Sequence, residues 1–244
     1  MSDAMYTAGT GAMVQQMRLD LLANNLANVN SPGYKADKAL FRSYLTTAEG
    51  EAPSMGVANH HVRFDGSRID FSAGPVQASD NPLDLAVEGQ GFFSVQTPDG
   101  VRYTRAGNFT RSSDGVLVTQ DGHPVLGDGG EIRLGNGSVN VDAQGNVSVS
   151  GAAVGRLAVV DFPEPGSLEK AGNTLFAPVG DAAGESLGER AAVRQGFIEM
   201  ANINPVLAMT EMVEVLRAYE AYQKMIRTIS EIDTKSINDV GRPV

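Results

Sequence analysis

Residues 21–35 read LLANNLANVNSPGYK, and this stretch decides how the N-terminal part of the chain is expected to fold. Leu22, Leu26 and Val29 recur at the spacing of one helix face, yet four Asn residues share the same turns. Asn is a poor helix former because its side-chain amide competes for backbone hydrogen bonds. The residue before a Pro is pushed out of the α region, so we expect the helix to end near residues 28–30.

The same apolar spacing extends back towards the N-terminus. Its positions follow one another at alternating intervals of four and three residues, as in the seam of a coiled coil. These positions are Ala8, Ala12, Gln15, Leu19, Leu22, Leu26 and Val29. Apolar residues on one flank, such as Met13 and Met17, widen this surface. We therefore predict an N-terminal helix that packs against more than one neighbour.

The C-terminal segment has a similar pattern. Asn204-Pro205 predicts an N-cap with Pro at the first helical position, and the helix is expected to run from about residue 205 to about residue 238. One apolar line recurs at intervals of three and four residues, and it consists of Met212, Val215, Tyr219, Tyr222, Ile226 and Ile229. A second apolar line beside it consists of Met209, Val213 and Leu216.

The centre of the chain is rich in turns and acidic. Of the 28 Gly residues, 24 fall within residues 41–196, where 19 acidic groups outnumber 11 basic ones. Short β-prone runs within 82–197 are separated by Asp-Gly and Asn-Gly pairs, which favour tight hairpin turns. This pattern predicts an antiparallel meander closed into a sandwich or a small barrel. Residues 62–74, VRFDGSRIDFSAG, predict one more hairpin before it.

These patterns predict an α+β fold in four parts, with both terminal helices in a coiled-coil layer. Residues 1–30 form the N-terminal helix, 31–81 an extended or β-hairpin connector, 82–197 the β domain and 198–244 the C-terminal helix. A plain helical hairpin at the base of the same domain is the alternative. Burial of a large apolar side chain contributes roughly 2 kcal/mol, whereas ordering each residue costs roughly 1–2 kcal/mol. We therefore expect the ends to be weakly ordered in a lone subunit and to fold on assembly.

Composition and motifs exclude several classes of function. The chain has no Cys and a net charge of −10, which argues against Cys-based metal sites and against general nucleic-acid or anionic-membrane binding. No apolar run reaches the roughly 18 residues of a membrane span, and the N-terminus lacks the regions of a Sec signal peptide. Gly89-Gln90-Gly91 lacks the third Gly of a dinucleotide loop, and His60-His61 lacks a third ligand at metal-site spacing. We expect no catalytic residue, cofactor or metal.

Three blocks of the sequence resemble the bacterial flagellar rod and hook family. The first is YTAGTGAMVQQMRLDLLANNLANVNSPGYKAD (6–37), which contains the NNLANVN and GYK core of the family. The second is NPLDLAVEGQGFFSV (81–95) with YTRAGNFTRSSDGVLVTQDGHPVLG (103–127). The third is VRQGFIEMANINPVLAMTEMVEVLRAYEAYQKMI (193–226). Their order is that of the family, and the proximal-rod subunits resemble the chain most, with distal-rod subunits as the alternative.

The resemblance implies a structural subunit of the basal-body rod, which passes through the periplasm and transmits torque. It implies export through the flagellar type III apparatus without a cleaved Sec signal, assembly with copies of itself and other rod subunits, and an inner coiled-coil layer inside the β domains. The Asn amides are expected to set the register between subunits. The expected subunit-interface residues are Met5, Ala8, Ala12, Gln15, Leu19, Leu22, Asn24, Asn25, Leu26, Asn28, Val29, Asn30, Met209, Met212, Val213, Val215, Leu216, Tyr219, Tyr222, Ile226 and Ile229.

Two other classes of protein stay open from the residues alone. One is a secreted β-rich module that binds glycans, because aromatic residues such as Phe92, Phe93 and Phe109 can stack on sugar rings. Core packing is the preferred role for these rings. The other is a carboxylate-based hydrolase acting on the cell wall, because a fold can bring two of the many acidic residues together.

Overall fold

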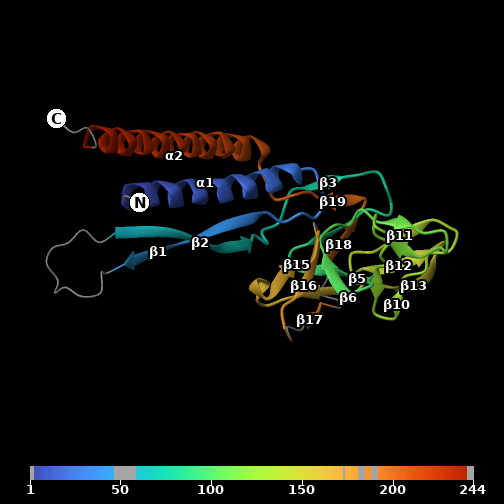
Figure 1. Cartoon of the computed structure of the whole chain (residues 1–244). Coiled ribbons are helices and arrows are strands. Elements are labelled where there is room, and N and C mark those ends of the chain that lie inside the picture. The colour runs from blue at the N-terminus through green and yellow to red at the C-terminus, as the bar shows by residue number, and fades with distance from the viewer. Residues whose placement is uncertain (1–2, 47–58, 173, 181–184, 188–191, 241–244) are drawn as a thin grey trace. The chain divides into compact units, whose positions relative to one another are not determined.

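The computed structural model describes residues 3–46, 59–172, 174–180, 185–187 and 192–240. The chain divides into two compact units. Unit 1 consists of the residues up to Leu26, Asp37–Arg68 and the residues from Asn204 onwards. Unit 2 consists of Ala27–Ala36 and Ile69–Ile203. Unit 1 holds both α-helices and a two-stranded sheet, and unit 2 holds the other strands (Figure 1).

The two helices of unit 1 are α1 (Asp3–Ala27) and α2 (Pro205–Val240). The Asn204 side chain accepts hydrogen bonds from the backbone N–H groups of Val206 and Leu207, at 3.1 and 3.2 Å. It therefore caps α2 where the sequence predicts, with Pro205 as the first helical residue. The predictions of an N-terminal and a C-terminal helix are confirmed.

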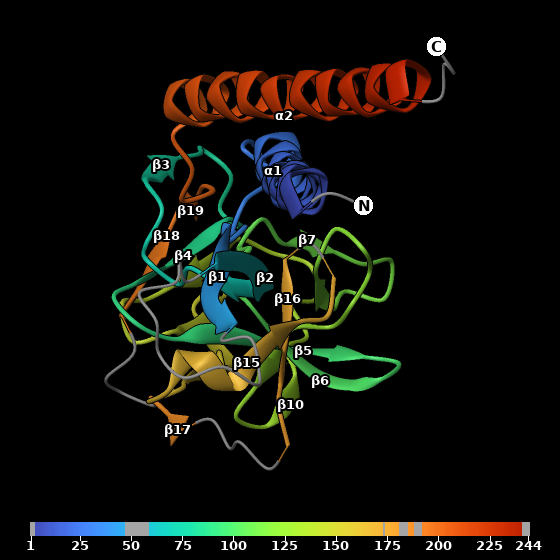
Figure 2. The same cartoon turned by 60° about the vertical axis from the view of Figure 1, so that its left-hand side comes forward.

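The helices run in opposite directions in Figure 1, and Figure 2 shows that they cross at an angle, with α1 seen nearly end-on below α2. Arg18 Nη2 lies 3.2 Å from Glu211 Oε1, which links the two helices through an ion pair. Gly11 faces the ring of Tyr222 so closely that a Cβ at Gly11 would lie 2.5 Å from ring atom Cε1. A glycine at this position lets the helix backbone approach the ring.

The sheet of unit 1 pairs β1 (Asp37–Thr46) with β2 (Asn59–Ile69). Phe41 and Phe64 meet edge to face with ring centroids 6.0 Å apart, and Arg42 Nε lies 2.9 Å from Asp65 Oδ2. The hairpin predicted within 62–74 is wrong. β2 continues through Asp65 and the following Gly because its β-prone residues pair with β1 instead of folding back.

The strands of unit 2 are short, and a 3₁₀ turn (Pro165–Ser167) precedes β15. They are β3 (Val76–Ala78), β4 (Leu85–Glu88), β5 (Phe92–Thr97), β6 (Gly100–Thr104), β7 (Thr110–Arg111), β8 (Leu117–Val118), β9 (Leu126–Gly127), β10 (Gly130–Glu131), β11 (Val139–Val141), β12 (Asn146–Val149), β13 (Ala152–Arg156), β14 (Val159–Asp161), β15 (Leu168–Lys170), β16 (Leu175–Pro178), β17 (Glu185–Ser186), β18 (Ala192–Gln195) and β19 (Phe197–Glu199).

The largest sheet has six strands in the order β15-β16-β6-β5-β14-β17, and its pairings are antiparallel. A second sheet has the order β11-β12-β13. The last strands of the unit return to its first strands, since β18 pairs with β4 and β19 pairs with β3. An antiparallel β-rich centre is therefore confirmed, but its strand order is not that of a simple meander.

Turn signals predict some of these connections and not others. Asp99-Gly100 joins the paired strands β5 and β6, and Asp114-Gly115 joins the paired strands β7 and β8. Gly100 and Gly115 both have positive φ, as tight hairpin turns require. Asn136-Gly137 is not a hairpin turn, because β10 pairs with β9 and β11 pairs with β12. A turn signal marks where the chain bends but not which strands pair across the bend.

The core of unit 2 lies on both faces of β5. Successive side chains on a strand point to opposite faces, so Phe92 and Phe93 enter separate hydrophobic clusters. Phe93 packs against Phe109 with ring centroids 5.1 Å apart, whereas Phe92 packs against Phe176 at 5.7 Å. All four rings are buried. Core packing is thus the role of these aromatic residues, as the sequence analysis prefers.

Candidate subunit interface

One side of α2 carries the first predicted apolar line. We call Met212, Val215, Tyr219, Tyr222, Ile226 and Ile229 the inner line. Val215 is buried and the other five residues are partly buried. Because helix residues three and four apart share one face, this line forms a continuous strip along the helix.

The second predicted line of α2 is exposed. Met209, Val213 and Leu216, which we call the outer line, leave 53%, 48% and 42% of their surface accessible in the single chain. Three large apolar residues on one exposed helical strip are uncommon unless another surface covers them. The outer line is therefore the strongest candidate surface for contact with another subunit.

A third exposed apolar set on α2 was missed by the sequence analysis. Leu207, Met225 and Ile232 are all at least half exposed. They share one side of the helix, because 18 residues complete five turns and seven residues complete about two turns. A search for apolar residues 7 or 18 positions apart, in addition to three or four, would have identified this set in the sequence.

The predicted line on α1 lies mainly on the inner side of the helix. Ala8 and Ala12 are buried, Gln15, Leu19, Leu22 and Leu26 are partly buried, and Val29 is partly buried in the turn that follows the helix. Met5 is partly buried, whereas Met13 on the flank is exposed. Both helices therefore combine a sheltered apolar face with further apolar residues outside it.

At least two Asn residues at the end of α1 form hydrogen bonds within the chain. The Asn25 side chain is buried, accepts a hydrogen bond from Asp37 N at 3.0 Å and donates one to Asp37 O at 2.9 Å. Asn28 accepts from the Ser31 hydroxyl at 3.1 Å and, through its carbonyl, from Ser31 N at 3.0 Å. These bonds shape the chain as it leaves the helix, where the Asn-rich stretch was expected to end the helix and turn the chain. Asn24 and Asn30 are exposed.

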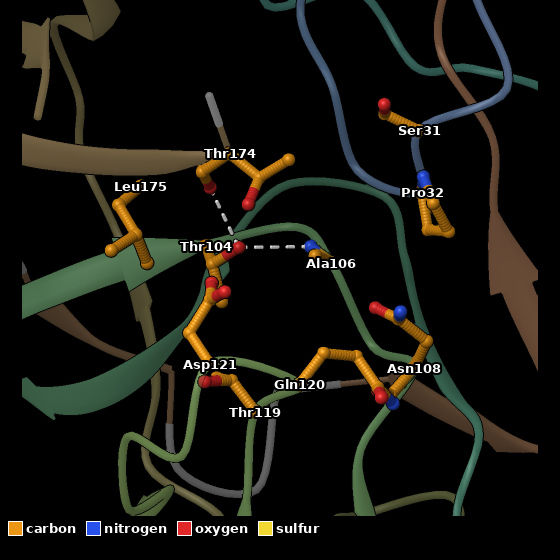
Figure 3. Close-up of a pocket in the computed structure, with 10 residues that line it drawn as sticks. All are labelled: Ser31, Pro32, Thr104, Ala106, Asn108, Thr119, Gln120, Asp121, Thr174 and Leu175. Atoms are coloured by element: carbon orange, nitrogen blue, oxygen red, sulfur yellow. Dashed lines mark hydrogen bonds between the residues drawn. The ribbon is translucent and has the colours of Figure 1, made fainter. Parts of the chain in front are cut away.

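A small cavity of about 220 Å³ lies within unit 2 (Figure 3). Its walls are formed by Ser31, Pro32, Thr104, Ala106, Asn108, Thr119, Gln120, Asp121, Thr174 and Leu175. The Thr104 hydroxyl donates to Thr174 O at 2.7 Å and accepts from Ala106 N at 3.0 Å, and Gln120 Nε2 donates to Asn108 O at 2.6 Å. These polar groups hold neighbouring loops together, and the cavity is smaller than the roughly 300–1,000 Å³ of typical ligand sites.

Among the residues that the structure describes, no group of three or more His, Asp or Glu side chains is placed to hold a metal ion. The side chains of His60 and His61 lie outside the described part of the chain. Neither of the described helices is both long and apolar enough to cross a bilayer.

Three buried charged residues of unit 2 were absent from the predicted sites. They are Lys35, Arg105 and Glu199, and each is no more than 6% exposed. Lys35 and Glu199 are 164 residues apart in the sequence, so no local spacing signals their contact. Lys35 follows Tyr34 in the GYK motif, but a Lys beside an aromatic residue is at most a weak sign that the Lys is buried.

Three family models match the chain in the order of the three sequence blocks. They are the flagella basal body rod protein model over residues 5–35, the flagellar hook protein FlgE/F/G D1 domain over 86–149, and the flagellar basal body rod FlgEFG protein C-terminal model over 194–239. Together they include most of α1, part of the β-rich centre and most of α2.

Relatives are similar over nearly the full chain. The flagellar basal-body rod protein FlgF of Caulobacter vibrioides is 34% identical, with 99% of each chain covered. The flagellar basal-body rod protein FlgG of Bacillus subtilis is 32% identical, covering 96% of this chain and 98% of the relative. The flagellar hook-basal body complex protein FlhO of Bacillus subtilis is 30% identical, covering 99% and 100%. The resemblance read from the three blocks is confirmed, and these relatives are structural proteins rather than enzymes.

Proposed function

The chain belongs to the family of flagellar basal-body rod proteins, and from that premise we propose that it is a subunit of the proximal rod. The proposal takes the chain to be the counterpart of rod protein F. It is supported by the similarity to FlgF over 99% of both chains and by Pro205, which suits the proximal type. In this role the protein is a structural part of the drive shaft that transmits torque.

The observation that carries the proposal is the exposed outer line of α2. Met209, Val213 and Leu216 have no reason to line up on an exposed strip unless another surface covers them. We infer that a neighbouring subunit does so, and that the inner and outer lines together let α2 pack in more than one direction. Helices packed in this way resist twisting because a twist strains many contacts at once.

The proposed assembly keeps the sequence-based arrangement of the chain. The two ends of the chain, 1–30 with α1 and 198–244 with α2, form an inner coiled-coil layer, and the β domain, closed as a sandwich or barrel, lies outside it. The predicted subunit-interface residues on α1 and α2 make the contacts. The partners are copies of this chain and other rod subunits, and the flagellar type III apparatus exports the protein to the periplasm.

A distal-rod role is the second candidate. It is favoured by the 32% identity to FlgG of Bacillus subtilis, which is close to the 34% identity to FlgF of Caulobacter vibrioides. Both roles use the same helical surfaces, so they differ in position along the rod rather than in mechanism.

The location of the subunit in isolated basal bodies tests the proposal. A short epitope inserted at the exposed Asp128-Gly129 turn allows labelling in electron micrographs. A proximal subunit gives label confined to the short segment beside the start of the rod. Label along the long distal segment would select the second candidate, and absence of the subunit from purified basal bodies would overturn both.

A further inference from the structure

Unit 2 contains a buried cluster of three charges. Lys35 Nζ lies 2.6 Å from Glu199 Oε1, and Arg105 Nη1 lies 3.2 Å from Glu199 Oε2. The three side chains are 1%, 6% and 2% exposed for Lys35, Arg105 and Glu199. One carboxylate therefore bridges two cations away from water.

Backbone groups complete the cluster. Lys35 Nζ donates to Ser72 O at 2.7 Å, and the Glu199 carboxylate accepts from Gly74 N at 2.9 Å. Arg105 Nη2 donates to a backbone carbonyl of the β4–β5 loop at 2.6 Å. Burial lowers the pKa of Lys35 and of Arg105, and the nearby Glu199 charge opposes that shift. Most polar atoms of the cluster are thus hydrogen-bonded, as buried charges require, although Arg105 Nε is buried without a hydrogen-bond partner.

The residues beside the cluster join the same segments. Gly33 N donates to Glu199 O at 2.8 Å, and Ala36 N donates to Asn202 Oδ1 at 2.8 Å. Asn202 Nδ2 also donates to Asp70 O at 2.8 Å. Segments 33–36, 70–74 and 199–202 are therefore held together. Each lies beside a point where the chain passes from one unit to the other.

This arrangement has little room to adjust. Gly33 has a φ of +68°, and a Cβ there would collide with the backbone of Arg105 and Ala106. A Cβ at Gly74 would collide with the carbonyl group of Met200. Neighbouring segments pack backbone to backbone, so a lost ionic contact cannot be replaced by side-chain repacking.

A buried ion cluster is a poor device for stability alone, because well-packed apolar residues of similar size often serve as well. Its directional bonds, however, specify which segments meet. We propose that Lys35, Arg105 and Glu199 form a latch that fastens segment 33–36 to segment 199–202, so that order near the start of the chain depends on a residue near its end. The latch also sets where the ordered part of a free subunit begins.

Hydrogen exchange on the full-length purified chain tests the latch, whatever the chain assembles with. The amides of Gly33 and Ala36 report directly, since both donate to segment 199–202. Glu199→Gln keeps the size of the side chain but removes its charge. We expect exchange in a peptide covering 33–36 to accelerate at least tenfold, with exchange in the distant β11–β12 hairpin (139–149) unchanged.

Two further variants keep the test decisive. Lys35→Met removes one cation and leaves the pair between Arg105 and Glu199, so it gives a local acceleration even if Glu199→Gln unfolds the whole unit. Glu88→Gln is the matched control, because Glu88 pairs with Arg194 at 3.1 Å on the surface, where both side chains are about half exposed. Wild-type exchange at 33–36 in both latch variants, or equal acceleration in the control, would overturn the proposal.

Discussion

Replacing the outer line of α2 with acidic residues is expected to block assembly while sparing the free chain. The change is the double substitution Val213→Asp and Leu216→Asp. Val213 and Leu216 are 48% and 42% exposed, so the free chain loses only the part of each side chain that is already buried, about 1 kcal/mol per residue. The lower helix propensity of Asp costs roughly 0.5 kcal/mol per site.

The expected loss at the interface is larger. Full burial of a Val or Leu side chain contributes about 1.5–3 kcal/mol, so covering the remaining half contributes about 1 kcal/mol per residue. Burying a polar group without a partner costs about 1–3 kcal/mol more. The two substitutions together therefore remove about 4–8 kcal/mol per subunit contact, which is a factor of about 1,000 or more in the dissociation constant.

The assay compares two readouts for the same variant. Incorporation is measured by purifying basal bodies from cells that express the variant in place of the native chain, and folding by urea unfolding of the purified chain. The matched control is Ala221→Asp with Thr228→Asp, which adds the same charges at two exposed positions of α2 outside the outer line. Normal rods with the outer-line variant, or equally damaged rods with the control, would refute the assignment of the interface.

Three smaller changes test the local structure of the helices and of one hairpin. Asn204→Ala removes the cap of α2 and should cost about 1 kcal/mol of helix stability, seen as a loss of helical circular dichroism that Asn204→Asp avoids. Gly11→Ala should lower the temperature at which isolated basal bodies release the subunit, because its Cβ would strike Tyr222, whereas Gly9→Ala has open space and should raise it; the same shift for both would contradict the close approach. The Asp142 pKa lies below its usual range because the carboxylate accepts hydrogen bonds from an amide side chain four residues on and from the backbone. Its contribution to stability is thus present above about pH 4 and lost as the pH falls through the lower folded pKa, so Asp142→Asn should flatten the acid limb of urea unfolding, and an unchanged limb would count against it.

Local signals in the sequence predicted the helices well. Asn204 and Pro205 mark the start of α2 because capping depends only on neighbouring backbone groups. The Asn-rich stretch marked the end of α1, although Asn25 proved to bond Asp37 within the chain. Periodicity also separated the inner from the outer line, since it follows from helix geometry alone.

Contacts between distant parts of the sequence were not predictable in the same way. The pairings of β18 with β4 and of β19 with β3 join strands more than 100 residues apart, and turn residues carry no information about such partners. The latch residues were invisible for the same reason, because a lone Lys or Glu reads as a surface residue until its burial is known. The sequence predicted that the outer line forms an apolar strip on α2. Which subunit covers this strip depends on the assembly and cannot be predicted from one sequence.

An electron cryo-microscopy map of basal bodies that contain this subunit tests the central claim most directly. The account predicts that α1 and α2 lie in the inner layer of the rod, with Met209, Val213 and Leu216 in van der Waals contact with a neighbouring subunit. A map in which this line faces solvent, and the β domains alone join the subunits, would contradict it.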